Sequence, residues 1–185
     1  RVDASFLECT PSAQLVITNT SGYEHLEKPE LRRLGVAAAR LPISRREPVV
    51  ERTLWSVLHG LHRMSTQLQG AGRGAWERAS LPEMGIATLN GARVGVVGCG
   101  VIGARVSLVM QGLGARIRVV EPREGKLGFA RATLRDAAAW ADVLTLHCGM
   151  DTGNQHLIND GLLRLMRPGA ILVNTARGGL VEWEA

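Results

Sequence analysis

The residues best suited to chemistry form a glycine-rich run, Gly98-Cys99-Gly100-Val101-Ile102-Gly103. An apolar run that predicts a strand precedes it, and apolar residues at helical spacing follow it. In such a strand–turn–helix unit, Gly98 permits the tight turn and Gly100 lets the backbone approach a pyrophosphate. Gly103 then allows the helix to pack closely on the strand. The pattern predicts a dinucleotide-binding turn; a glycine turn with only a packing role is the alternative.

Residues on either side of this turn favour NAD as the dinucleotide. The N–H groups at the helix start, near Val101 and Ile102, favour a bound anion such as a pyrophosphate. Glu121, followed by Pro122, ends the next predicted strand, where a carboxylate accepts hydrogen bonds from ribose hydroxyls and repels a 2′-phosphate. Arg123 is either a ligand for that phosphate, which would favour NADP, or a solvated surface arginine. We expect NAD rather than NADP.

A second candidate lies in the segment 167–181, where an apolar strand ends at Asn174 and Arg177 stands between small residues. Ligands of open α/β sheets bind beyond the carboxyl ends of the strands. Arg177 is therefore placed where a planar cation can bind a carboxylate. An arginine that only ties down its loop is the alternative.

The elements that position these residues alternate between strands and helices from Asn90 onward. Such alternation predicts a parallel sheet with helices on both faces, an α/β, Rossmann-type doubly wound fold. The expected strands are 93–97, 117–120, one within 128–133, 143–146 and 170–173, and the expected helices start at 101, 134 and 161.

The N-terminal residues predict a separate, smaller α/β piece. We expect strands over 15–18 and 36–41 around a helix at 29–34. A long helix over 48–64 and a Gly-, Ser- and Pro-rich loop over 69–83, with Trp76 as a packing anchor, follow. The expected domains are thus residues 1–47, a partial α/β domain, and residues 48–185, the Rossmann-type domain.

Composition excludes several other classes of protein. The 185 residues carry a net charge of +5, but the basic residues are scattered and aromatics make up only 4%. We therefore expect no nucleic-acid partner. The apolar runs are too short to span a bilayer, so we expect no membrane partner. Three widely spaced cysteines match no zinc site, which favours no metal and a reducing, cytoplasmic location.

The chain resembles the D-isomer-specific 2-hydroxyacid dehydrogenases. The similarity runs through 89–103, 144–148 and 157–159 and is most specific in 167–181; upstream, 22–27 and 48–51 resemble the substrate loop and interdomain helix. The resemblance implies hydride transfer between NAD and a small 2-hydroxy or 2-oxo acid, in a parent protein that is a homodimer. It implies that Arg177 is the substrate-binding catalytic residue. It also implies that residues 1–47 are part of a flavodoxin-like substrate domain and that residues 48–185 are an NAD-binding domain truncated at its C-terminus.

The same resemblance implies further site residues. Backbone amides at Ser21 and Gly22 match the loop that holds the substrate carboxylate. Cofactor contacts are expected at His147, Cys148, Asn154, Thr175 and Ala176. Thr20 and His25 depart from the family pattern, as does Gly149, where a proline is usual. These departures affect substrate identity more than cofactor binding.

The family's acid/base histidine lies downstream of the arginine block, and none of the five histidines matches it. We therefore expect an internal fragment that binds NAD and turns over poorly by itself. Two alternatives remain open: an NAD(H)-sensing, co-repressor-like binding protein on the same fold, and a phosphite or formate dehydrogenase.

Overall fold

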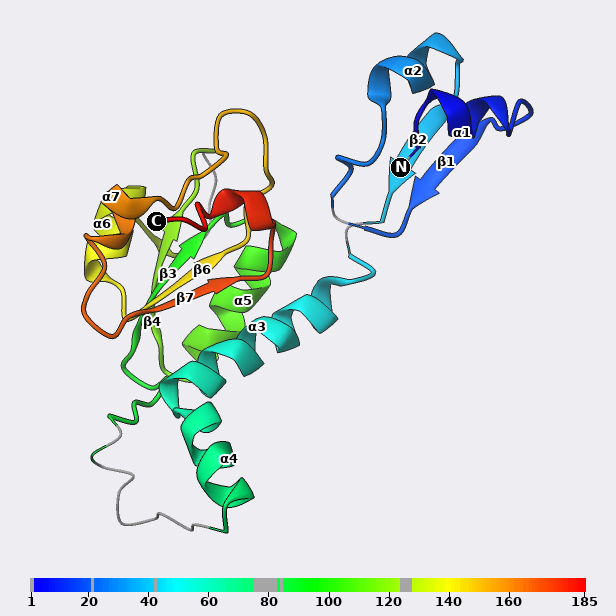
Figure 1. Cartoon of the computed structure of the whole chain (residues 1–185). Coiled ribbons are helices and arrows are strands. Elements are labelled where there is room, and N and C mark those ends of the chain that lie inside the picture. The colour runs from blue at the N-terminus through cyan, green and yellow to red at the C-terminus, as the bar shows by residue number, and fades with distance from the viewer. Residues whose placement is uncertain (1, 21, 42, 75–82, 84, 124–127) are drawn as a thin grey trace. The chain divides into compact units, whose positions relative to one another are not determined.

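The computed structural model describes residues 2–20, 22–41, 43–74, 83, 85–123 and 128–185. The chain divides into two compact units, Arg1–Pro48 and Val49–Ala185 (Figure 1). Each unit has its own packed core.

The smaller unit is a β-α-β arrangement preceded by a short helix. Its elements are α1 (Ala4–Glu8), β1 (Leu15–Thr18), α2 (Lys28–Arg33) and β2 (Ala37–Arg40). The two strands pair in parallel, from Leu15 with Ala37 to Thr18 with Arg40. The two strands and α2 confirm the sequence-based expectation. Helix α1 was not expected; the Asp3 side chain caps it by accepting a hydrogen bond from the Phe6 N–H.

The larger unit is built on a five-stranded parallel sheet with the order β5-β4-β3-β6-β7. The strands are β3 (Arg93–Val97), β4 (Arg116–Val120), β5 (Ala130–Arg131), β6 (Val143–Leu146) and β7 (Ile171–Asn174). The chain runs outward from β3 through β4 to β5 and then returns to the other side of β3 with β6. This order confirms the Rossmann-type fold and puts its switch point between β3 and β6.

Helices cover both faces of this sheet (Figure 1). Helices α3 (Arg46–Leu61) and α5 (Val101–Gly112) pack on one face, and α6 (Leu134–Trp140) and α7 (Asp160–Leu163) pack on the other. Alternate strand residues feed the two cores, because successive side chains point to opposite faces. In β6, for example, Val143 joins the first core, whereas Leu144 and Leu146 join the second.

The region after α3 differs from the expected loop. Helix α3 begins at Arg46 and ends at Leu61, and α4 (Met64–Gly72) starts after Arg63, whose φ of 52° breaks the helical path. The predicted loop over 69–83 is therefore wrong for its first four residues. Once a helix has started, each further residue adds a hydrogen bond, which offsets the cost of the helical glycines. Trp76 lies outside the described residues.

Two glycines of α5 provide a direct test of how closely this helix packs on the sheet. A Cβ at Gly103 would lie 1.9 Å from the Gly98 carbonyl oxygen, whereas one at Gly112 would meet nothing within 4 Å. We expect Gly103→Ala to lower the free energy of unfolding by about 1–3 kcal/mol, because backbone must move to admit the methyl group. Gly112→Ala should leave it unchanged or raise it by up to about 1 kcal/mol. Urea unfolding measures both; equal effects would contradict this packing.

Candidate functional site

The carboxyl ends of four strands meet at one edge of the larger sheet. Val97 of β3 pairs with Val120 of β4 and with Leu146 of β6, and Leu146 in turn pairs with Asn174 of β7. Because the strands are parallel, the residues that follow them emerge at the same edge. This edge therefore carries the glycine turn, Glu121 with Pro122, His147 with Cys148, and the segment Thr175 to Arg177.

The turn after β3 is pressed against the end of β6. Gly98 has a φ of +88°, in the region that favours glycine. A Cβ there would lie 2.6 Å from the Cys148 nitrogen and 2.7 Å from its Cα. The Gly98 N–H also donates to the Val120 carbonyl, at 2.8 Å. Glycine is thus required at this position for both its backbone conformation and its close contact.

The turn delivers the start of α5 to this edge. Gly100 is the N-cap residue and is extended, and no side chain caps the helix. The first N–H groups of α5, near Val101 and Ile102, therefore form the kind of helix start that binds an anion. A Cβ at Gly100 would have only the Arg123 Nη2 atom nearby, at 3.9 Å. The side of the turn that a pyrophosphate would approach is thus free of close backbone contact.

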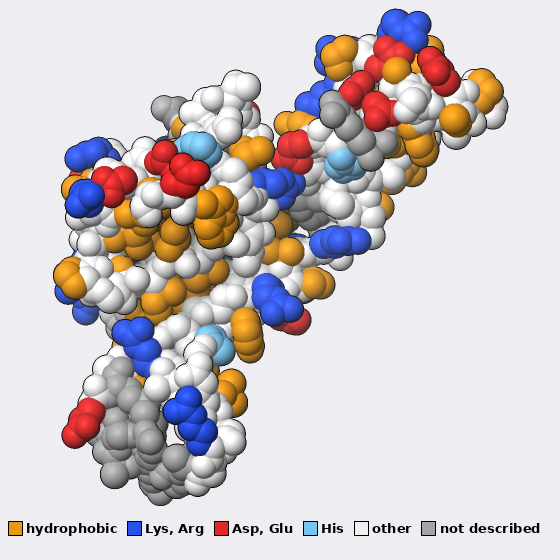
Figure 2. All heavy atoms as spheres, in the orientation of Figure 1, with side chains coloured by type: hydrophobic (Ala, Val, Ile, Leu, Met, Phe, Trp, Pro, Cys, Tyr) orange, Lys and Arg blue, Asp and Glu red, His pale blue; other side chains and the backbone are white. Residues whose placement is uncertain are grey.

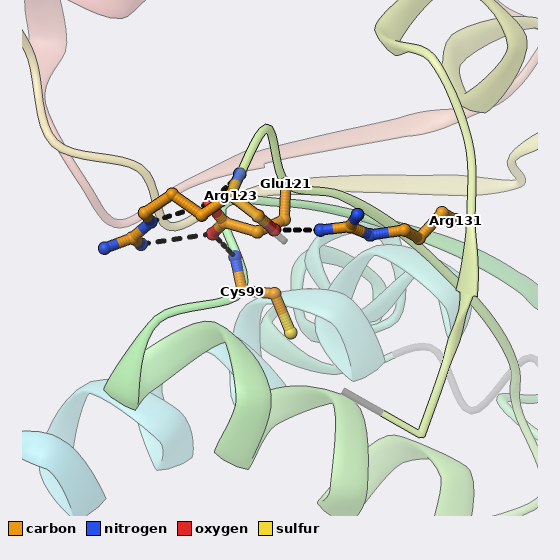
Figure 3. Close-up of polar contacts among 4 residues, drawn as sticks. All are labelled: Cys99, Glu121, Arg123 and Arg131. Atoms are coloured by element: carbon orange, nitrogen blue, oxygen red, sulfur yellow. Dashed lines mark hydrogen bonds and ion pairs between the residues drawn. The ribbon is translucent and has the colours of Figure 1, made fainter. Parts of the chain in front are cut away.

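Glu121 ties the glycine turn to the end of β4 (Figure 3). Its Oε2 accepts a hydrogen bond from the Cys99 N–H at 2.9 Å, and its Oε1 accepts from the Arg123 N–H at 3.2 Å. The Arg123 guanidinium adds Nε to Oε1 at 2.9 Å and Nη2 to Oε2 at 3.2 Å. The hydrogen bond from Arg123 is the main reason that the pKa of Glu121 falls to about 2. Glu121 is therefore a carboxylate at neutral pH, while Pro122 is exposed beside it.

Asn174 shapes the segment that carries Arg177. Its Nδ2 donates to the Arg177 carbonyl at 2.8 Å, and its Oδ1 accepts from the Ala176 N–H at 3.0 Å. The Arg177 Nη1 donates to the Ala176 carbonyl at 2.8 Å, and the arginine is half-buried. Sequence reasoning did not assign this role to Asn174. An Asn directly after a buried strand is the signal, because Asn side chains bond to neighbouring backbone groups.

A buried hydroxyl on α3 also holds this segment. The Oγ1 atoms of Thr53 and Thr175 lie 3.0 Å apart, and Thr53 donates its proton to the Val49 carbonyl at 2.8 Å. Each hydroxyl has one proton, so Thr175 donates to Thr53. Thr53 is fully buried, and sequence reasoning missed it. A threonine among the apolar residues of an amphipathic helix was the available signal.

His147 and Cys148 form the wall of the site at the end of β6. The His147 Nε2 lies 3.0 Å from the Oγ1 of Thr145, and burial lowers the pKa of His147 to about 4. Burial also raises the pKa of the Cys148 thiol. Both side chains are therefore uncharged at neutral pH.

Asn154 lies in the loop after β6, where its side chain closes the loop on itself. Its Nδ2 donates to the Gly149 carbonyl at 2.7 Å, and its Oδ1 accepts from the Asp151 N–H at 2.7 Å. The structure thus gives Asn154 a role in holding the loop, and its cofactor contact stays a prediction.

The expected substrate loop belongs to the smaller unit and follows β1. Thr20 donates to the Gly22 carbonyl at 2.7 Å, Thr18 and Thr20 hydroxyls lie 2.6 Å apart, and the His25 Nε2 lies 3.1 Å from Thr18. Because each hydroxyl has one proton, the chain of donors runs from His25 through Thr18 and Thr20 to Gly22. The two departures from the family pattern thus form one network. Ser21 lies outside the described residues.

Three further observations concern other kinds of site. Within the described residues, no three or more His, Cys, Asp and Glu side chains gather as metal ligands would. No helix in the described part of the chain is both long and apolar enough to cross a membrane. Figure 2 shows Lys and Arg side chains spread over the visible face of the larger unit rather than gathered in one patch.

The depressed pKa of Glu121 predicts how stability depends on pH. Its pKa falls from 4.5 to about 2 on folding, so the ionised carboxylate stabilises the fold fully above about pH 4.5. This contribution is lost as the pH falls towards 2, because the unfolded chain takes up the proton first. We therefore expect Glu121→Gln to destabilise the protein at pH 7 and much less at about pH 2.5, as measured by urea unfolding. The control is Glu51→Gln on the exposed side of α3, which removes the same charge. If wild type and Glu121→Gln differ in free energy of unfolding by the same amount at both pH values, the pKa shift is contradicted.

Comparison with known proteins identifies the family. The sequence model of the D-isomer specific 2-hydroxyacid dehydrogenase, NAD binding domain, matches residues 53–185. D-lactate dehydrogenase kk1H of Curvularia clavata is 30% identical over 174 residues, which is 92% of this chain and 49% of that protein. 2-Hydroxyacid dehydrogenase A of Aspergillus oryzae is 43% identical over 101 residues, which is 53% of this chain and 29% of that protein.

A solved structure agrees with these sequence relatives. D-lactate dehydrogenase from Aquifex aeolicus, complexed with NAD and lactic acid, superposes with a TM-score of 0.87 at 25% identity, over 98% of this chain and 55% of that one. The chain thus spans about half the length of this structure and at most about half the length of the two relatives. The family model covers more than two thirds of the chain. The chain belongs to the D-isomer specific 2-hydroxyacid dehydrogenase family.

Proposed function

We propose that this chain supplies the cofactor site and the substrate-binding arginine of an NAD-dependent oxidoreductase. The enzyme would transfer a hydride between nicotinamide and C2 of a small 2-hydroxy or 2-oxo acid. One observation carries the proposal: the glycine turn, the ionised Glu121 and the Arg177 segment all emerge at one edge of the sheet.

The residues of this edge fit a dinucleotide. Gly98 and Gly103 hold backbone at positions that a Cβ would fill, and Gly100 leaves the approach to the α5 N–H groups open. These N–H groups would bind the pyrophosphate, and Glu121 would accept the adenosine ribose hydroxyls. Because the Glu121 carboxylate repels a 2′-phosphate, the proposed physiological cofactor is NAD.

The other half of the edge would receive the nicotinamide and the substrate. His147, Cys148, Thr175 and Ala176 would line the nicotinamide side, and the bound nicotinamide would supply or accept the hydride. Arg177 would bind the substrate carboxylate and orient the C2 carbonyl. His147 is a wall rather than an acid/base group, since a buried imidazole with a pKa of about 4 is neutral at neutral pH.

We also propose that the parent protein is a cytoplasmic homodimer. Helices α3 and α5 of the larger unit carry exposed apolar side chains: Trp55 is 56% exposed and Leu108 is 54% exposed. Contiguous exposed apolar patches mark interaction surfaces, and we propose that these two helices contribute one in the dimer. The three cysteines are free thiols, which fits a reducing compartment.

The proposed role of Arg177 is tested by Arg177→Gln in the full-length parent protein. We expect kcat/KM for 2-oxo acids to fall on the order of 10²–10³-fold, because a charge-assisted hydrogen bond that orients the reacting carbonyl is lost. The Kd for NADH should stay within about twofold, since Arg177 is proposed to bind the substrate. Steady-state kinetics across a panel of 2-oxo acids and NADH fluorescence titration measure these two quantities.

The matched control is Arg135→Gln on the exposed side of α6, which removes the same charge away from the site. It should leave both quantities unchanged. An Arg177→Gln enzyme with wild-type kcat/KM on every substrate of the panel would refute the assignment.

A further inference from the structure

We infer that Arg123 is a specificity-determining residue that lets this site accept a 2′-phosphorylated dinucleotide as well as NAD(H). The inference rests on the proposed function, because it concerns the adenosine end of the same site. It assigns a role to a residue that the proposed mechanism leaves without one.

The carboxylate of Glu121 already accepts as many hydrogen bonds as it can. A carboxylate offers roughly four lone-pair sites, two on each oxygen. In Glu121, Oε1 accepts from the N–H and Nε of Arg123, and Oε2 accepts from the Cys99 N–H and the Nη2 of Arg123. All the sites are therefore engaged, and ribose hydroxyls can bind this carboxylate only if the guanidinium leaves.

Glu121 is buried, whereas its partner Arg123 is exposed. The Glu121 side chain is 5% exposed, whereas that of Arg123 is 78% exposed. The Cys99 N–H on Glu121 belongs to the packed glycine turn and holds the carboxylate in place. The Arg123 side chain is the mobile partner, because a long exposed side chain pays little to rotate into water.

The guanidinium of Arg123 lies beside the glycine turn. Its Nη2 would lie 3.9 Å from a Cβ on Gly100, so Arg123 stands at the dinucleotide turn itself. Figure 3 shows its third nitrogen on the side away from Glu121. A guanidinium presents N–H groups in a planar fork that matches phosphate oxygens. Arg123 can therefore bind a 2′-phosphate while it shields that phosphate from the carboxylate.

A second guanidinium, that of Arg131, lies close to Arg123. Arg131 of β5 reaches the same place and donates a hydrogen bond to the Arg123 carbonyl oxygen. Among the described residues of this cluster, the Glu121 carboxylate is thus accompanied by two guanidinium groups, that of Arg123 on the carboxylate itself and that of Arg131 on the Arg123 backbone. A lone carboxylate at this position would reject a phosphate, but this cluster attracts one.

The test uses the 185-residue chain and equilibrium binding, so it requires no turnover. The Kd values for NADH and NADPH are measured by fluorescence titration, at one fixed low ionic strength, for wild type, Arg123→Ala and Arg116→Ala. Arg116 is the matched control: it is exposed at the opposite end of the same strand, β4, and its removal changes the net charge equally.

We expect wild type to bind NADPH within about tenfold of NADH. Arg123→Ala should weaken NADPH at least ~10-fold, through loss of a charge-assisted contact, while NADH binds equally well or a few-fold more tightly. Arg116→Ala should keep the wild-type ratio of the two Kd values. Retained NADH binding by Arg123→Ala also shows that the variant is folded.

Each other outcome overturns the inference. If wild type binds NADH but discriminates against NADPH by more than ~10-fold, or if Arg123→Ala and Arg116→Ala give the same ratio of the two Kd values, Arg123 does not set cofactor choice and the proposed function stands. If wild type binds neither dinucleotide, both the proposed cofactor site and this inference are refuted.

Discussion

The close approach of two backbones at the switch point is the constraint on which the rest of the site depends. The turn after β3 contacts the first residues beyond β6 so tightly that Gly98 has no room for a Cβ, and the Gly98 carbonyl in turn leaves no room for one at Gly103. This contact fixes where α5 starts, and hence where its free N–H groups point. It also sets the distance between the turn and the His147–Cys148 wall. The position of α5 and the proposed cofactor cradle thus depend on one steric fit.

Polar residues at the edge of the sheet serve the fold and the site at once. Glu121 holds the Cys99 N–H of the glycine turn, and Asn174 holds the backbone of Ala176 and Arg177. A hydrogen bond to a charged group stabilises a fold by about 1.5–3 kcal/mol, so Glu121 matters before any ligand binds. Loss of such a residue would therefore affect stability and binding together.

Local patterns allowed most of the fold and part of the site to be predicted. The five strands, the glycine turn and Arg177 follow from apolar periodicity and short motifs, which act over a few neighbouring residues. Helix α4 was missed because its glycines resemble a loop when helix propagation is ignored. The hydrogen bond between Thr53 and Thr175 joins residues 122 positions apart, and the two bonds from the Arg123 guanidinium depend on a side-chain conformation. The threonine pair is set by tertiary packing and the arginine contacts by the choice of side-chain rotamer, so neither contact can be read from spacing in the sequence.

The burial of the groups at this edge of the sheet has a consequence for how the protein responds to pH. The pKa of Glu121 is about 2, that of His147 is about 4, and burial raises the pKa of the Cys148 thiol above its usual value of 9.0. From about pH 5 to 8 these three groups keep one charge state, so the cofactor edge is electrically constant across the range in which histidines ordinarily titrate. If the proposed activity is measured, a bell-shaped rate profile in that range would therefore report proton transfer at other groups, and not a change in the charge of these three.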